Sequence, residues 1–346
     1  MESLSRILSA STALVYAVLM CAALTSPAAA HHSFAAAYDM GTDTEIEGRI
    51  TQIRWVNPHI KIYVAALNGQ IWEAEAGPVN LLSRMGIEKS MLKIGEAIRV
   101  RGNPGRRNAR TLWVSNIMLP DKTELLVAPG AQPHRAWASK KTVGNPNALS
   151  EPGDRTAGAE RSFFRTWEPP DLERFPRRRG EPVLTDAGRR AQARYESSKQ
   201  VIADCEVPGM PFAMVSPYPI EIVRQGDRLL IRGEAYDLRR VVYLAAPASP
   251  PAPSPLGLSV GRIVGDELIV ETSRINYHSY GDLGPAQSAQ SHVVERFKLS
   301  ADGINLDYEI TVTDPVMLAK PWSWGGAFVS RKGAAIRPWN CGKDRG

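Results

Sequence analysis

Short segments that alternate apolar and polar residues recur along most of this chain of 346 residues, with turn residues between them. Such alternation places every second side chain on one face of an extended strand. One group of these segments spans residues 45–119, and a second runs from Cys205 to Cys341. A chain with this pattern buries its apolar faces by pairing strands, so we expect an all-β protein.

The first group predicts five strands and one short helix. "EIEGRITQIRWV", "IKIYVAAL" and "QIWEAEAG" read as three strands, with Asn68-Gly69 as a hairpin turn. "PVNLLSRMGI" reads as a helix, because Pro78 suits a first helical turn and Gly86 suits its end. "EAIRVRGNPGR" and "TLWVSNIML" add two strands. This order is that of an OB-fold, so we expect an OB-fold-like small barrel over residues 31–120.

Residues 121–183 differ in composition, since Pro, Gly, Arg, Ser and Asn dominate and the apolar periodicity disappears. We expect a Pro/Arg-rich linker that is largely disordered. Large aromatic residues within it are expected to dock it onto a neighbouring domain: Trp137, Phe163, Phe164 and Trp167. A short helix is predicted to follow, with Thr185 as its N-cap.

The second group contains about eight strand-like segments, several of them joined by tight turns such as Gln225-Gly226-Asp227. Consecutive antiparallel strands in this number form an up-and-down barrel or a strongly curled sheet. We therefore expect an antiparallel, lipocalin-like barrel or curled sheet over residues 184–346. A barrel of this size can hold a small ligand.

The first 30 residues have the pattern of a secretory signal peptide. Arg6 precedes an apolar run from Ile7 to Leu24, and three alanines follow it. Cleavage after Ala30 would make His31 the first residue of the mature chain, whereas a retained anchor is the alternative. The prediction is a periplasmic or secreted protein with no stable membrane span after cleavage. The net charge of +6 comes largely from scattered arginines, so we expect no nucleic-acid partner.

Removal of the signal peptide leaves two cysteines, Cys205 and Cys341. An even pair in an oxidising compartment predicts a disulfide, and two unpaired thiols are the alternative. The bond would connect the end of the chain to the start of the second domain.

Three histidines form a candidate metal site: His31, His32 and His59. A new amine at His31 would chelate a metal ion together with imidazole nitrogens, and copper is the best match to such ligands. In the alternative interpretation, His59 is an ordinary turn histidine.

Polar residues on the predicted strands of the second domain are the other candidates. One arginine of the adjacent pair Arg239-Arg240 must face the barrel interior, where Glu295 or Glu309 would neutralise it. His292 lies three residues before Glu295, so the two face opposite sides of a strand. The candidate catalytic set is His292, Glu295, Glu309 and Arg240, and the candidate ligand-binding set is Arg239, Glu221, Glu271, Tyr277 and Trp322.

The stretches "AHHSFAAAYD", "EIEGRITQIRWVNPHIKIYV" and "LKIGEAIRVRGNPGRR" resemble an exported bacterial family of unknown function, numbered 6152. The resemblance covers about residues 30–120 and implies export and an OB-like fold, with no established activity. Its specific motifs stand here as His31-His32-Ser33 and Asn57-Pro58-His59. The segments "LTDAGRRA", "CEVPGMP" and "HVVERF" make the second domain similar to another group of uncharacterised exported bacterial proteins. In the loop after the fifth strand, "RINYHSYGDLG" departs from the pattern of that group.

These observations predict a binding protein for a small apolar or carboxylate-bearing molecule in the C-terminal barrel, with a candidate copper site at the mature N-terminus. The chain contains no GxSxG, HExxH or phosphate-loop motif. A hydrolase, lyase or isomerase without an organic cofactor is the first alternative. An envelope module that contacts another protein is the second.

Overall fold

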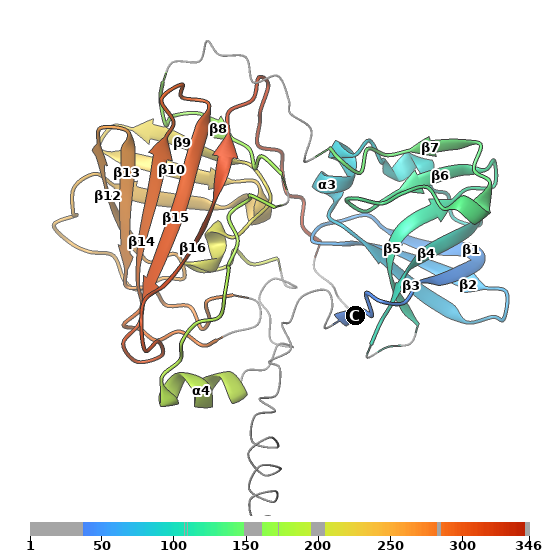
Figure 1. Ribbon diagram of the computed structural model, residues 1–346, viewed down its shortest axis with the longest axis horizontal. Coiled ribbons are helices and arrows are strands. Elements are labelled where there is room, and N and C mark those ends of the chain that lie inside the picture. The colour runs from blue at the N-terminus through green and yellow to red at the C-terminus, as the bar shows by residue number, and fades with distance from the viewer. Residues whose placement is uncertain are drawn as a thin grey trace, which may run out of the picture.

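Two β-barrels lie side by side in the computed structural model, and the segment that follows the last strand runs between them (Figure 1). Strands make up 42% of the protein and helices 10%, which confirms the expected all-β class. The structure describes residues 37–106, 108, 110–148, 161–171, 173–194, 205–281 and 285–342. Residues 1–30, where the sequence predicts a signal peptide, therefore lie outside the described residues.

The first barrel has five strands and is closed. Its strands are β1 (Thr44–Arg54), β2 (Ile60–Ala66), β3 (Ile71–Ala76), β4 (Ala97–Pro104) and β5 (Thr111–Met118). They pair in the order β3-β2-β1-β4-β5, and a parallel pairing of β3 with β5 completes the ring. Helix α3 (Val79–Arg84) connects β3 to β4, begins after Pro78 and ends before Gly86, whose φ is 80°. The predicted OB-like order is confirmed.

Along the strands of the first barrel, the apolar residues of the alternating pattern point into the barrel. Ile60, Ile62 and Val64 of β2 are completely buried, and their neighbours along the strand are partly exposed. Gly48 lies where β1 and β2 approach closely, since a Cβ there would lie 2.2 Å from the carbonyl oxygen of Ala65. Burial of apolar side chains on one face of each strand is what stabilises this barrel.

The region expected to be a linker contributes strands to both sheets. β6 (Thr123–Leu126) and β7 (Lys141–Val143) extend the first sheet, and β8 (Thr166–Trp167) belongs to the second. The described parts of residues 121–183 therefore differ from the expected disordered tether. These strands have two to four residues each, which is too short to produce a recognisable alternation.

The aromatic residues of this region dock largely as expected. Trp137 is buried and its Nε1–H donates to Oε2 of Glu45 at 3.0 Å. Phe163 and Trp167 belong to the core of the second barrel, whereas Phe164 remains 36% exposed. This docking connects the region to both domains.

The second barrel has nine strands and is nearly closed. After β8 come β9 (Ile220–Gln225), β10 (Arg228–Gly233), β11 (Arg239–Tyr243), β12 (Leu258–Val264), β13 (Glu267–Ser273), β14 (His292–Leu299), β15 (Asn305–Thr313) and β16 (Trp322–Val329). They pair in sequence order, and β11 with β12 is the parallel pair among them. Backbone bonds of 3.0 and 2.7 Å between Glu168 and Val329 bring the two edges together. The eight predicted segments are all confirmed, and β8 is the addition.

Helix α4 (Asp186–Ala193) confirms the short helix predicted after Thr185, whose Oγ1 accepts a hydrogen bond from the Gly188 N–H at 3.0 Å. Short 3₁₀ helices occupy Lys89–Met91, Arg135–Trp137, Phe212–Met214 and Ala235–Asp237. Among the described residues, no helix combines the length and the apolar character needed to span a bilayer.

The C-terminal segment after β16 joins the two domains. Trp339 and Tyr218 are buried in the core of the first barrel, although neither belongs to its strands. The backbone N–H of Gly342 donates to the carbonyl oxygen of Asn57 at 3.0 Å. Cys341 forms the predicted disulfide with Cys205. The end of the described chain is thus held to the first domain by packing and to the second by a covalent bond.

Candidate binding cavity between the two domains

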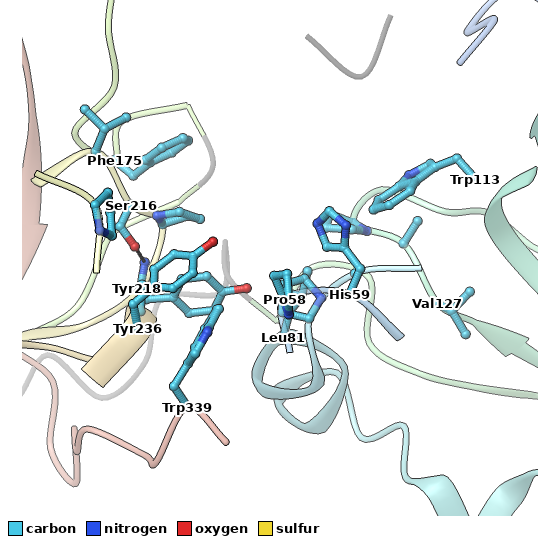
Figure 2. Close-up of a pocket in the computed structure, with 18 of the residues that line it drawn as sticks. Pro58, His59, Leu81, Trp113, Val127, Phe175, Ser216, Tyr218, Tyr236 and Trp339 are labelled. Carbon is cyan, nitrogen blue, oxygen red and sulfur yellow. Dashed lines mark hydrogen bonds between the residues drawn. The ribbon is translucent and has the colours of Figure 1, made fainter. Parts of the chain in front are cut away.

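A cavity of about 710 Å³ lies between the two domains. The first domain contributes residues from the β1–β2 turn, α3, β5 and the segment after β6, and the second contributes residues from its loops and from the C-terminal segment. Figure 2 labels the principal lining residues: Pro58, His59, Leu81, Trp113, Val127, Phe175, Ser216, Tyr218, Tyr236 and Trp339. Most of this lining is apolar, with a few polar groups, as in small-molecule sites.

His59 lies on the first-domain wall and is held by a carboxylate. Its Nδ1 is 2.5 Å from Oε1 of Glu75, and the other oxygen of Glu75 accepts a hydrogen bond from the Tyr38 hydroxyl at 2.8 Å. Burial raises the pKa of Glu75, but the hydrogen bonds and charge of His59 and the Tyr38 bond outweigh it, so that pKa lies below its ordinary value. An ionised Glu75 fixes a proton on Nδ1 and thereby sets the orientation of the ring.

The turn before His59 is fastened to α3 through Asn57. The side chain of Asn57 accepts a hydrogen bond from the backbone N–H of Val79 at 2.8 Å and donates to Oδ1 of Asn80 at 2.9 Å. It also donates to the carbonyl oxygen of Trp339. The Asn-Pro-His motif therefore positions one wall of the cavity, and it connects that wall to the C-terminal segment.

The opposite wall carries three aromatic side chains that each have one polar group. Trp339 is 2% exposed, and its Nε1–H has no hydrogen-bond partner within the described part of the chain. Its ring lies 5.0 Å from that of Tyr218 and 5.3 Å from that of Tyr236. The tyrosine hydroxyl groups point towards Pro58 and His59 (Figure 2). Burial raises the pKa of Tyr218 well above its ordinary value, so its hydroxyl is a neutral hydrogen-bond donor.

A buried ion pair connects the two domains beside the cavity. Glu234 of the second domain is completely buried and accepts hydrogen bonds from Arg84 of α3 at 2.5 and 2.7 Å. The Asn80 amide and the backbone N–H of Arg337 donate to the same carboxylate at 2.9 and 3.0 Å. Both carboxylate oxygens are therefore satisfied by groups of the first domain and the C-terminal segment.

The interior of the second barrel is filled by a core of buried side chains that also encloses an ion pair. Arg240 is the inward member of its pair and binds Glu295 bidentately, with 3.0 Å for the Nη1–Oε1 contact. Ser259 and Thr272 accept from Arg240 at 3.0 and 2.7 Å, and the Tyr308 hydroxyl donates to Glu295 at 2.9 Å. These groups satisfy one another, so the arrangement is that of a structural ion pair.

The other candidates of the second domain lie elsewhere. Glu309 and Arg239 are exposed, and His292 is partly exposed on the face of β14 opposite Glu295. Glu221 pairs with Arg232 at 2.7 Å and Glu271 with Arg262 at 2.8 Å on the outer surface. Tyr277 lies 4.6 Å from the His278 ring, and the buried Trp322 packs 4.7 Å from Trp324. The structure does not bring the proposed catalytic set to one position.

Of the metal candidates, His59 is described, and His31 and His32 lie outside the described residues. Within the described ranges no group of three or more His, Cys, Asp or Glu side chains could hold a metal ion.

Sequence reasoning missed most of the cavity. Tyr218, Trp339 and Trp113 were not predicted as site residues, because single aromatic residues within and between strands are common in any β protein. For Tyr218 and Trp339 the available signal was a large aromatic residue in a segment outside the strands, which is typical of groups that pack one domain against another.

The protein is therefore an all-β protein of two barrels with a mostly apolar cavity between them. The model of a family described as "Family of unknown function (DUF6152)" matches residues 18–113. This match confirms the resemblance found in the first domain, and it includes His59 and Trp113 of the cavity wall. No curated protein and no solved structure matches the chain.

Proposed function

We propose that this protein binds a small, mostly apolar molecule that carries a hydrogen-bond acceptor, in the cavity between its two domains. The observation that carries this proposal is the Nε1–H of Trp339, which is buried at the cavity wall without an acceptor among the described residues. A buried indole N–H normally has a partner, since leaving it unsatisfied costs about 1–3 kcal/mol. A ligand acceptor would supply that partner.

The location differs from that expected from the sequence, although the kind of ligand is similar. The second barrel is filled by its own core, whereas the space between the domains measures about 710 Å³. The Tyr218 hydroxyl is a second donor at the same wall. With the predicted signal peptide, the proposal places this binding in the periplasm or outside the cell.

Two isosteric probes test the proposal: 2-acetylnaphthalene, which has a carbonyl acceptor, and 2-ethylnaphthalene, which has none. Equilibrium dialysis gives the dissociation constant of each. We expect Trp339→Phe to weaken binding of the acetyl compound about tenfold, the equivalent of one hydrogen bond, and to leave the ethyl compound nearly unchanged.

A cavity-filling variant gives a separate readout. Ala213 lines the cavity, so Ala213→Trp should weaken both probes, whereas Ala193→Trp on the exposed surface of α4 should weaken neither. The proposal is wrong if the wild-type protein binds neither probe saturably, or if the two alanine variants behave alike.

A second candidate function, copper binding at the mature N-terminus, is favoured by the contact between Nδ1 of His59 and Glu75. Histidines that ligate metals commonly donate one ring N–H to a carboxylate, which leaves the other nitrogen for the metal. In this proposal His59 acts with His31, His32 and the new amine.

Titration with copper(II) tests this second candidate on the mature protein beginning at His31. N-terminal acetylation and His59→Gln should each weaken binding at least about tenfold, because each removes one ligand. Equal affinities of the free and acetylated forms would exclude the amine chelate.

A further inference from the structure

A second space between the domains has a different chemical character. It measures about 260 Å³ and shares the lining residue Pro217 with the apolar cavity. Leu81 lines the apolar cavity, whereas Ser83 and Arg84, further along the same helix, line this smaller one. Its charged lining residues are Arg84, Glu168, Arg331 and Arg337.

Arg331 is the most informative of these residues. Its side chain is 11% exposed, its Nη2 donates to the carbonyl oxygen of Pro170 at 3.0 Å, and its Nη1 lies 3.5 Å from Oε2 of Glu168. Its Nε–H is buried and has no hydrogen-bond partner among the described residues. Native proteins rarely leave a charged donor in this condition, and an ordered water or a bound ion is among the groups that account for the exceptions.

The smaller cavity has a net positive charge, because three arginines and one glutamate line it. Arg84 is neutralised by Glu234, and Arg331 has one distant contact with Glu168. Arg337 is exposed, and its Nη1 reaches the hydroxyl of Ser83 at 3.5 Å. Three guanidinium groups, those of Arg84, Arg331 and Arg337, therefore stand beside two carboxylates, those of Glu168 and Glu234. The Glu234 carboxylate already accepts hydrogen bonds from Arg84, from Asn80 and from the backbone N–H of Arg337.

We propose that this arginine-lined cavity binds a small oxyanion, a carboxylate or a phosphate, between Arg331 and Arg337. A guanidinium group presents parallel donors that match the oxygens of such anions. The anion would supply the acceptor that the Nε–H of Arg331 lacks and would balance the charge of Arg337. This site is independent of the proposed function, because it does not use the residues that carry the apolar cavity.

Isothermal titration calorimetry in a low-chloride buffer, with inorganic phosphate and succinate as separate probes, tests the site. We expect saturable binding of at least one probe with a dissociation constant of about 1 mM or below. Arg331→Gln and Arg337→Gln should each weaken it about tenfold or more. The matched control is Arg296→Gln, which removes an exposed arginine of the same domain that pairs with Glu267.

Each result decides the question. Loss of binding in both cavity variants with retention in Arg296→Gln supports the site, and Arg337→Gln keeps the test valid if Arg331→Gln fails to fold. The absence of saturable binding up to about 10 mM would overturn it. So would equal weakening in all three variants, which would show attraction to net charge alone. An effect of Arg331→Gln without one of Arg337→Gln would also reject it, because Arg331 lines a separate polar cavity of about 500 Å³ with Arg165.

Discussion

Arg240 and Glu295 illustrate how far a single residue position can be derived from sequence. Adjacent residues of a strand face opposite sides, so one arginine of the pair had to point inward and required a carboxylate. The alternation within each strand separates Glu295 from Glu309, because Glu295 shares a face with the apolar Val293 and Phe297, whereas Glu309 lies on the polar face of its strand. In the structure Glu295 faces the core and Glu309 faces solvent.

Glu295→Gln tests the contribution of this pair to stability. It leaves the Arg240 charge buried without its counter-ion, so we expect a loss of about 3–5 kcal/mol in the free energy of unfolding. The matched control is Glu267→Gln, because the contact of Glu267 with Arg296 is exposed and should contribute less than about 1 kcal/mol. Urea unfolding followed by circular dichroism measures both, and equal losses would contradict the structural role.

Asp314 predicts a pH dependence of stability. Burial raises the pKa of Asp314, but bonds from the Tyr280 hydroxyl and from Ser288 outweigh this, so that pKa lies below the ordinary 3.8. A lowered pKa in the folded state stabilises the protein above the ordinary value, and this stabilisation disappears as pH falls through the lowered one. At neutral pH, Asp314→Asn should lose about 1.5–3 kcal/mol.

Urea midpoints of wild type and Asp314→Asn, measured at neutral pH and again below pH 3.8, check this expectation. The difference between the two proteins should shrink at the lower pH. A difference that stays constant across the two conditions would show that the charge of Asp314 does not stabilise the fold.

At the scale of elements, alternation and turn residues identified eight strands of the second barrel and the order of the first. They failed for β6, β7 and β8, because a strand of two to four residues contains at most two inward positions. These strands form because neighbouring edges were open to pairing, for example through contacts of β6 with β5 and of β8 with β9. Such tertiary pairing leaves no local pattern in the sequence.

The disulfide makes a prediction about the C-terminal segment. Cys205 and Cys341 are 136 residues apart in sequence, and closing a long loop restricts the unfolded chain. The double substitution Cys205→Ser with Cys341→Ser should lower the free energy of unfolding by about 2–5 kcal/mol. Urea unfolding of wild type with and without reductant provides the comparison, and unchanged midpoints in both experiments would show that docking of the segment suffices without the bond.

At the scale of the whole molecule, the cavity was beyond sequence reasoning because it belongs to neither domain alone. Its two walls are aligned by Glu234 and Arg84, which are 150 residues apart in the chain. Each is an unremarkable charged residue in its own segment. A relation between distant positions of this kind requires either co-variation among relatives or a structure.

Glu234→Gln should therefore loosen the contact between the domains while leaving each barrel intact. Breaking a buried ion pair costs about 3–5 kcal/mol, and because this pair joins the two domains, the cost reduces the free energy of their association. We expect calorimetry to resolve two unfolding transitions in the variant and a single one in the wild type. Small-angle scattering should give the variant a larger radius of gyration than the wild type. Glu221→Gln, which removes a carboxylate paired within the second sheet, serves as control. Identical scattering curves for wild type and Glu234→Gln would contradict a role of this pair in domain alignment.

The burial of Trp339 within the first barrel also sets an order of events during folding. Asn57 contacts the backbone of Trp339 across 282 residues of chain, and the strands of the first sheet end at Val143. Because a polypeptide is synthesised from its N-terminus, the residues of these strands are complete long before Trp339 is added. During that interval the first barrel exposes the apolar surface that Trp339 later covers. Such surface invites aggregation, so the newly made protein passes through a period in which it depends on chaperone protection or on rapid completion of synthesis.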